Sequence, residues 1–257
     1  MSYFRAEIVK MRTLPSVWLS SALALVIPMC LAMLNAYKLN RALESGETTQ
    51  FLNTSTSDIG FGHMIYGSIG TVIIGVVVIS SEYTKNGQNV ARARQLSTTM
   101  VVMPNRAKAV TAKICALCTW VLSVGTCTTA LTLMASRYIL GSYAEDISYD
   151  YLRRFTGIVV YWMMMAVISA AFTVIAKNGV LPLVVLITNC TVISFSRLLA
   201  LITDLARFLP DTAALSTFLT NSPLSSPLSS NTAFVVCLGW MVLAYITTLI
   251  LWIREDV

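Results

Sequence analysis

Long apolar runs without a charged side chain restrict the fold of this chain more than any other feature. A helix that crosses about 30 Å of hydrocarbon needs roughly 20 apolar residues. Runs without Lys, Arg, Asp or Glu occur at 13–37, 59–81, 114–136, 155–176 and 178–196. The last uncharged stretch, 212–253, is too long for one span, and the prolines and serines of TNSPLSSPLSSN mark a loop within it. The sequence therefore predicts six membrane-spanning helices.

The overall composition leads to the same class of protein. The chain is 56% hydrophobic and 12% charged, whereas about 25% of the residues of a soluble domain are charged. Too few polar residues remain to cover the surface of a water-soluble fold of 257 residues. We therefore expect an all-α integral membrane protein.

We expect a single transmembrane domain over residues 1–257. Its predicted parts are an interfacial helix at 1–14, spans at 16–37, 59–81, 113–136, 155–176, 178–200 and 232–253, a loop at 82–112, and an outer helix and loop at 201–231.

The first residues carry an amphipathic pattern. Phe4, Ile8 and Met11 fall on one helical face, which the charged residues of this segment avoid, namely Arg5, Glu7, Lys10 and Arg12. This pattern predicts a short helix lying in the inner membrane interface, with its basic residues near lipid headgroups. A plain charged tail is the alternative.

The distribution of charge between loops predicts the orientation. Six spans place both termini on one side. The loops of that side, including 82–112, carry eleven Lys and Arg against four acids, and the loops of the other side carry seven against eight. Because basic loops stay in the cytoplasm, we expect the termini and the 82–112 loop to be cytoplasmic.

Ionisable residues are scarce at membrane depth. His63 is the only histidine and is expected to lie at the outer interface, and Arg197 is the only charged residue near the interior of a span. Such a chain lacks the groups that an ion-driven transporter or a channel with a charged ring requires. The six cysteines lie in apolar runs and are expected to pack as small apolar residues.

The sequence also lacks the usual catalytic motifs. It contains no phosphate-binding loop of the G-x-x-x-x-G-K-[ST] kind and no nucleophile or metal-ligand constellation. We expect no metal site, no nucleic-acid partner and no enzymatic activity of the chain by itself.

A ridge of small residues marks the second predicted span. Gly67, Thr71 and Gly75 recur every four residues, which lets two helix backbones approach closely. This spacing fits packing within the chain and fits equally a homodimer contact or a pathway-lining face.

The 82–112 loop has more internal order than orientation alone requires. Residues 80–114 hold six of the eighteen basic residues and one acid, Glu82. Glu82 and Tyr83 directly follow the second span, and Gly87 can end that helix in the left-handed conformation.

A short helix is predicted further along this loop. Leu96, Met100 and Met103 fall on one of its faces, and Pro104 ends it. An apolar face on such a helix must be buried by lipid or by a partner protein.

These residues resemble a loop of the type-2 ABC exporter permeases, in which E-[YF]-x-x-(N)G, a short helix and P-x-[RS]-x-x-x-x-x-[AG]-K connect the second and third spans. The matching positions here are Glu82, Tyr83, Gly87, Leu96, Pro104, Arg106, Ala112 and Lys113. The segment RQLSTTMVVMPNR is similar to the branch common in actinobacteria. The spacing from Gly87 to Pro104 is longer than in the commonest version of the motif.

The resemblance implies a permease subunit in a bacterial cytoplasmic membrane. In that family the loop forms a coupling helix that sits in a groove of a separate ATPase subunit, present in two copies, which holds ATP and Mg. Arg92, Arg94 and Arg106 would then pair with acids of the ATPase. A second permease half, identical or homologous, is implied too.

The implied activity is export of an amphipathic or apolar compound, such as an antibiotic, a modified peptide or a lipid-like molecule. The alternative from another class is a membrane scaffold or immunity protein whose basic loop binds anionic lipid or a partner.

Overall fold

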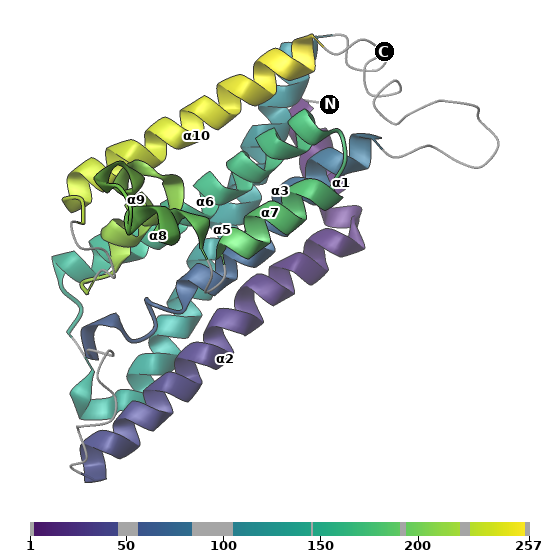
Figure 1. Ribbon diagram of the computed structural model, residues 1–257. Helices are drawn as coiled ribbons and strands as arrows, with labels where there is room; N and C mark the ends of the chain where they lie inside the picture. The colour runs from purple at the N-terminus through teal and green to yellow at the C-terminus, as the bar shows by residue number, and fades with distance from the viewer. Residues whose placement is uncertain are drawn as a thin grey trace.

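The computed structural model describes residues 3–45, 56–83, 105–144, 146–190, 194–221 and 227–254, and the fold below concerns these residues. All regular secondary structure in this part of the chain is helical (Figure 1). The predicted all-α class is therefore confirmed.

Five helices are long and apolar enough to cross a membrane. They are α2 (Pro15–Ser45), α3 (Met64–Tyr83), α5 (Arg106–Leu140), α6 (Tyr149–Ala176) and α10 (Ser230–Ile253). The shortest, α3, has 20 residues, which corresponds to about 30 Å of helix. Five of the predicted spans thus lie on helices of sufficient length.

The region of the fifth predicted span is built differently. Residues 178–200 contain two described helices, α7 (Val180–Cys190) and α8 (Phe195–Ala200), and residues 191–193 between them lie outside the described part. The eleven residues of α7 make a helix about 16 Å long, which alone is too short to cross the membrane. A count of six spans therefore stays a prediction.

The shorter elements are the helix α1 (Tyr3–Thr13), the 3-10 turns η1 (Thr56–Asp58), η2 (Gly141–Tyr143) and η3 (Asp204–Phe208), and the helix α9 (Pro210–Phe218). The sequence predicted an outer helix and loop for 201–231. Within this segment, α9 is buried along residues 211–218 and packs against α6 and α10. The burial is possible because its hydroxyls bond within the helix, as Thr217 Oγ1 does to Ala214 O at 2.6 Å.

The helices α3 and α6 form the centre of the bundle. Trp162 of α6 is fully buried, and its indole Nε1 donates to the carbonyl oxygen of Met64 at 3.0 Å. A Cβ atom at Gly67 would lie 2.1 Å from Trp162 Cζ2, and one at Gly75 would lie 2.1 Å from Ser169 Oγ. The ridge of Gly67, Thr71 and Gly75 thus packs within the chain, with both glycines against α6.

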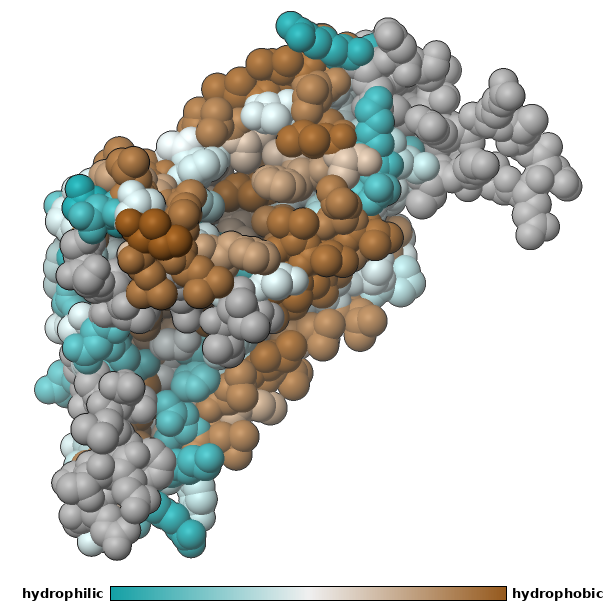
Figure 2. Space-filling view, viewed as in Figure 1, coloured by the Kyte–Doolittle hydropathy of each residue, from teal (hydrophilic) through white to brown (hydrophobic). Residues whose placement is uncertain are grey.

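The two ends of the bundle differ in what they bring together. At one end, which we call the loop end, lie α1, the last turn of α3, the first turns of α5 and the last turn of α10 (Figure 1). The flank between the ends is dominated by hydrophobic residues along α2, α7 and α10, while hydrophilic residues gather toward the ends (Figure 2). This distribution suits helices that cross a bilayer.

Candidate functional site

A network of four charged side chains lies at the loop end. Lys113 is 1% exposed, and its Nζ donates to Glu82 Oε1 at 2.9 Å and to Glu7 Oε2 at 2.7 Å. Lys10 donates to the same oxygen of Glu82. The network holds two positive and two negative charges and connects α1, α3 and α5.

Local sequence explains how these side chains meet. Asn105 caps α5 by accepting a hydrogen bond from the backbone N–H of Lys108 at 3.0 Å, and Lys113 follows two turns later. Glu82 stands in the last turn of α3. Glu7 and Lys10 are three residues apart on α1 and therefore share one helical face.

The energetics of this network depend on its completeness. Charges buried out of water carry a desolvation cost of several kcal/mol each, which close and well-bonded partners offset. Removing one partner of a buried pair typically costs about 3–5 kcal/mol, because the remaining charge stays buried. The network therefore holds α1 against the ends of α3 and α5 as one unit.

The network corrects two expectations from the sequence. Glu7 was expected to avoid the apolar face of α1, yet Glu7 is 4% exposed beside the buried Met11, whereas Phe4 is 40% exposed. Lys113 supplies the partner that makes this burial possible. Glu82 and Lys113 were expected only as residues that flank the loop, and their burial as an ion pair was not predicted from the sequence.

The last helix is attached to the same end. Arg106 Nη1 donates to the carbonyl oxygen of Ile253 at 2.9 Å, and the Tyr83 and Trp252 rings meet edge to face with their centroids 6.5 Å apart. Both flanks of the segment 84–104 are therefore fixed to α10 as well as to the network.

The predicted coupling residues divide into two groups. Glu82, Tyr83 and Arg106 are described and lie at the loop end. The others lie outside the described residues and stay predictions, namely Gly87, Arg92, Arg94, Leu96, Met100, Met103 and Pro104. The first and last positions of the motif, Glu82 and Lys113, form a direct ion pair.

A second buried ion pair, not predicted from the sequence, lies at the opposite end. Arg154 of α6 pairs with Asp58, and its Nε donates to the carbonyl oxygen of Phe218 at 2.7 Å. Asp58 also accepts hydrogen bonds from the backbone N–H groups of Thr220 at 2.9 Å and Asn221 at 3.0 Å. This pair joins α6, the turn before α3 and the end of α9.

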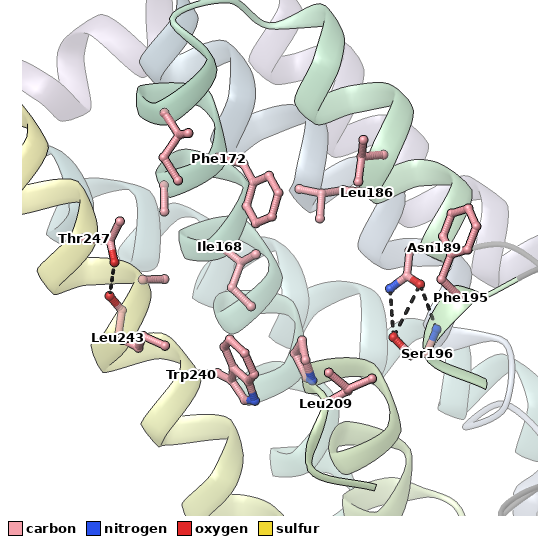
Figure 3. A pocket seen from close by; sticks show the side chains of 15 residues that line it. Ile168, Phe172, Leu186, Asn189, Phe195, Ser196, Leu209, Trp240, Leu243 and Thr247 are labelled. Atoms are coloured by element: carbon pink, nitrogen blue, oxygen red, sulfur yellow. Dashed lines mark hydrogen bonds between the residues drawn. The ribbon is translucent and has the colours of Figure 1, made fainter. Parts of the chain in front are cut away.

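An apolar pocket of about 340 Å³ lies between α6, α7, α8 and α10 (Figure 3). None of its lining residues carries a charged side chain. Its walls include Phe172 from α6, Leu186 from α7 and Trp240 from α10. Asn189 and Ser196 carry polar groups at one end of the pocket. It differs in kind from the charged network at the loop end.

The described residues offer no evident catalytic chemistry. Within the described ranges no group of three or more His, Cys, Asp or Glu side chains could hold a metal ion. The four charged side chains of the network bond to one another and are suited to holding helices together.

Comparison with known proteins gives one positive finding. The sequence profile of a family described as "ABC-2 family transporter protein" matches residues 3–194, which is about three quarters of the chain and includes the whole charged network. No curated protein matches the chain.

Proposed function

Because the chain belongs to the ABC-2 family of transporter membrane proteins, we propose that it exports an amphipathic or apolar compound with energy from a separate ATPase subunit. Proteins of this family are non-catalytic membrane subunits that generally pair with an ATPase subunit, which binds the ATP. To this family membership the proposal adds the direction of transport, the kind of substrate and the segment on which the ATPase acts.

The observation that carries the proposal is the charged network at the base of the segment 84–104. Glu82 precedes this segment and Lys113 follows it, and the two side chains bond to each other and to α1. A force applied to the segment by a docked ATPase would reach α1, α3 and α5 together. Helices held by a buried network move as a unit, since separating them would expose unpaired charges to a low-dielectric interior.

The remaining parts of the proposal concern the assembly. The segment 84–104 and both termini face the cytoplasm of a bacterial cell, and α7 with α8 completes a sixth span. Two ATPase copies and a second permease half, identical or homologous, complete the transporter. The excess of basic residues at the loop end supports this orientation.

Co-purification tests the place of ATPase docking. The chain is expressed with its ATPase, and the amount of ATPase retained is compared between wild type and the double variant Leu96→Asp, Met100→Asp. We expect the variant to lose most of the ATPase, since two carboxylates on the apolar face oppose burial in a groove.

A matched control separates the face from the added charge. The double variant Gln95→Asp, Thr98→Asp adds the same charge to other faces of the predicted helix and is expected to retain the ATPase. Full retention by the Leu96→Asp, Met100→Asp variant would remove this helix from the docking site. If no ATPase binds even the wild-type chain, a membrane scaffold becomes the better account.

A further inference from the structure

The pocket between α6, α7 and α10 combines a buried floor with a half-exposed rim. Leu186 and Ser196 at the floor are 6% and 7% exposed, whereas Phe172 and Leu243 at the rim are 38% and 53% exposed. The pocket therefore opens sideways on the flank of the bundle, where helices long enough to span a membrane would face lipid. A ligand could enter from within the bilayer.

Its size suits a small molecule. A volume of about 340 Å³ lies at the lower end of the range of about 300–1,000 Å³ found for ligand pockets. Aromatic and aliphatic side chains make up most of the wall, including Phe172, Leu186 and Trp240 (Figure 3). Such walls suit a single hydrocarbon chain or a slender ring system.

Asn189 and Ser196 supply polar groups at one end of the pocket, whereas Thr247 lies across the pocket with its hydroxyl bonded to the carbonyl oxygen of Leu243 at 2.9 Å (Figure 3). Asn189 Oδ1 accepts from the Ser196 backbone N–H at 3.4 Å, from Ser196 Oγ at 3.4 Å and from Ser194 Oγ at 3.3 Å. These distances exceed the usual 2.7–3.2 Å of strong hydrogen bonds. The hydroxyl and the amide oxygen can therefore exchange such weak bonds for shorter ones to a ligand (Figure 3).

The charge of the ligand follows from the lining. All fifteen lining residues are uncharged, but the buried carboxylate of Asp211 lies behind the polar end, where its Oδ2 accepts from Asn189 Nδ2 and, at 3.4 Å, from Ser196 Oγ. An anionic group placed there would lose its hydration and would lie near a like charge. A neutral hydroxyl or amide would instead bond to Asn189 or Ser196 while its chain lay along α6 and α10.

We propose that this pocket binds a neutral single-chain amphiphile, with its polar group at Asn189 and Ser196 and its hydrocarbon chain between Phe172 and Trp240. The assignment concerns the chain by itself. It does not depend on where the ATPase docks, so that its failure and the failure of the proposed function are separable.

Photolabelling tests the site. The wild-type chain in lipid nanodiscs is irradiated with a dodecanol analogue that carries a diazirine in its chain, and the labelled peptides are identified by mass spectrometry. We expect saturable labelling of peptides from 168–175 and 240–247. At equal membrane-bound concentrations, 1-dodecanol should compete at least about ten times better than dodecanoate, because a carboxylate would lie near the Asp211 carboxylate without a partner.

Two variants of α10 provide a matched pair. Leu243 and Val242 are both 53% exposed, and Leu243 lines the pocket whereas Val242 does not. Leu243→Trp should fill the pocket and reduce labelling at least about fivefold, as expected when a site is occupied by a side chain. Val242→Trp should leave labelling unchanged.

A third variant addresses the polar end. Ser196→Ala removes one hydroxyl and should weaken competition by 1-dodecanol about fivefold, the effect of one neutral hydrogen bond. Dodecane, which lacks a hydroxyl, should compete equally against both chains.

Several results would overturn the proposal. These are equal competition by dodecanoate, better competition by dodecylammonium than by 1-dodecanol, labelling that Leu243→Trp leaves intact, and labelling concentrated on a second apolar pocket, between α2 and α5 around Trp18 and Trp120. An absence of saturable labelling would equally reject it and would indicate that another protein surface covers this flank.

Discussion

At the scale of single residues, Lys113 is the side chain on which the loop end depends. It is almost fully buried, and it is the only residue of the network that bonds to acids on two other helices, Glu7 of α1 and Glu82 of α3. The side chain of Lys10 bonds to Glu82 and is partly exposed. The loss of Lys113 would therefore remove the ion pair that joins α1 to α5 and leave Lys10 to pair with Glu82 of α3.

Lys113→Met keeps the length and the apolar stem of the side chain but removes its charge. Two acids then remain buried with one partner fewer, and we expect a loss of about 3–5 kcal/mol in unfolding free energy. Thermal or denaturant unfolding in detergent measures it. Adding Glu7→Gln to the same chain should recover part of the loss, because one unpaired charge is then absent.

Lys108→Met is the matched control for this substitution. Lys108 lies on the same helix and is exposed, so its substitution should change the unfolding free energy by no more than about 0.5 kcal/mol. Equal effects of the two substitutions would show that the buried network contributes little to stability.

At the scale of elements, the close contact of α3 with α6 depends on glycine. A Cβ atom at Gly75 would lie 2.1 Å from Ser169 Oγ and 2.4 Å from the carbonyl oxygen of Ala166. The backbone oxygen cannot move away without displacing α6. Gly239 of α10, in contrast, has nothing within 4 Å of such an atom.

Alanine substitutions at the two glycines should therefore change the unfolding free energy in opposite directions. Gly75→Ala is expected to lower the unfolding free energy by about 1–3 kcal/mol through overpacking. Gly239→Ala should raise it by up to about 1 kcal/mol, because alanine is the better helix former. Melting temperatures of the purified variants measure both effects. An unchanged melting temperature in Gly75→Ala would mean that α3 and α6 pack less closely than described.

Long helices were predictable from the sequence, because twenty uncharged apolar residues leave a chain in a membrane few other structures. The charged network was not, since it joins residues 106 positions apart, Glu7 and Lys113. Only the fold shows that they meet. Two features of the sequence could have indicated the network. Glu82 and Lys113 flank one loop, and Glu7 and Lys10 share a face of the amphipathic helix.

The burial of α9 was equally hidden. Its buried residues 211–218 include one acid, Asp211, and three hydroxyl-bearing side chains, Thr212, Ser216 and Thr217, a composition that suggests an exposed segment. Gly157 of α6 allows the close approach, since a Cβ atom there would lie 2.6 Å from Thr217 Oγ1. The burial of α9 therefore depends on its close packing against α6, which lies far from it in the sequence.

The role of α7 and α8 is open to a direct test with topology reporters. Alkaline phosphatase fused after Lys177 should be inactive, and the same enzyme fused after Asn221 should be active, if this region crosses the membrane. Reporter activity on the same side at both positions would contradict both the sixth span and the fold, in which α1 and the last turn of α10 lie at the same end of the bundle.

At the scale of the whole molecule, charged contacts hold both ends of an otherwise apolar bundle. The network around Lys113 connects α1, α3 and α5 at the loop end, and the pair of Arg154 and Asp58 connects α6 with the end of α9 at the other. Between them lie α3 and α6, packed through glycines. A pull on the loop end can therefore tilt α1, α3 and α5 together against α10.

The central claim is that the network transmits movement of the segment 84–104 to the helices. Spin labels at positions 138 and 235 report it, because Tyr138 and Val235 are 90% and 69% exposed and lie on α5 and α10. The cysteines are replaced first, and the labelled chain is diluted with unlabelled chain in the complex with the ATPase.

The decisive measurement is the distance between these labels with and without ATP, in wild type and in Lys113→Met. We expect ATP to change the distance in wild type and to leave it unchanged in Lys113→Met, although the variant still binds the ATPase. An ATP-dependent change of the same size in Lys113→Met would contradict the account.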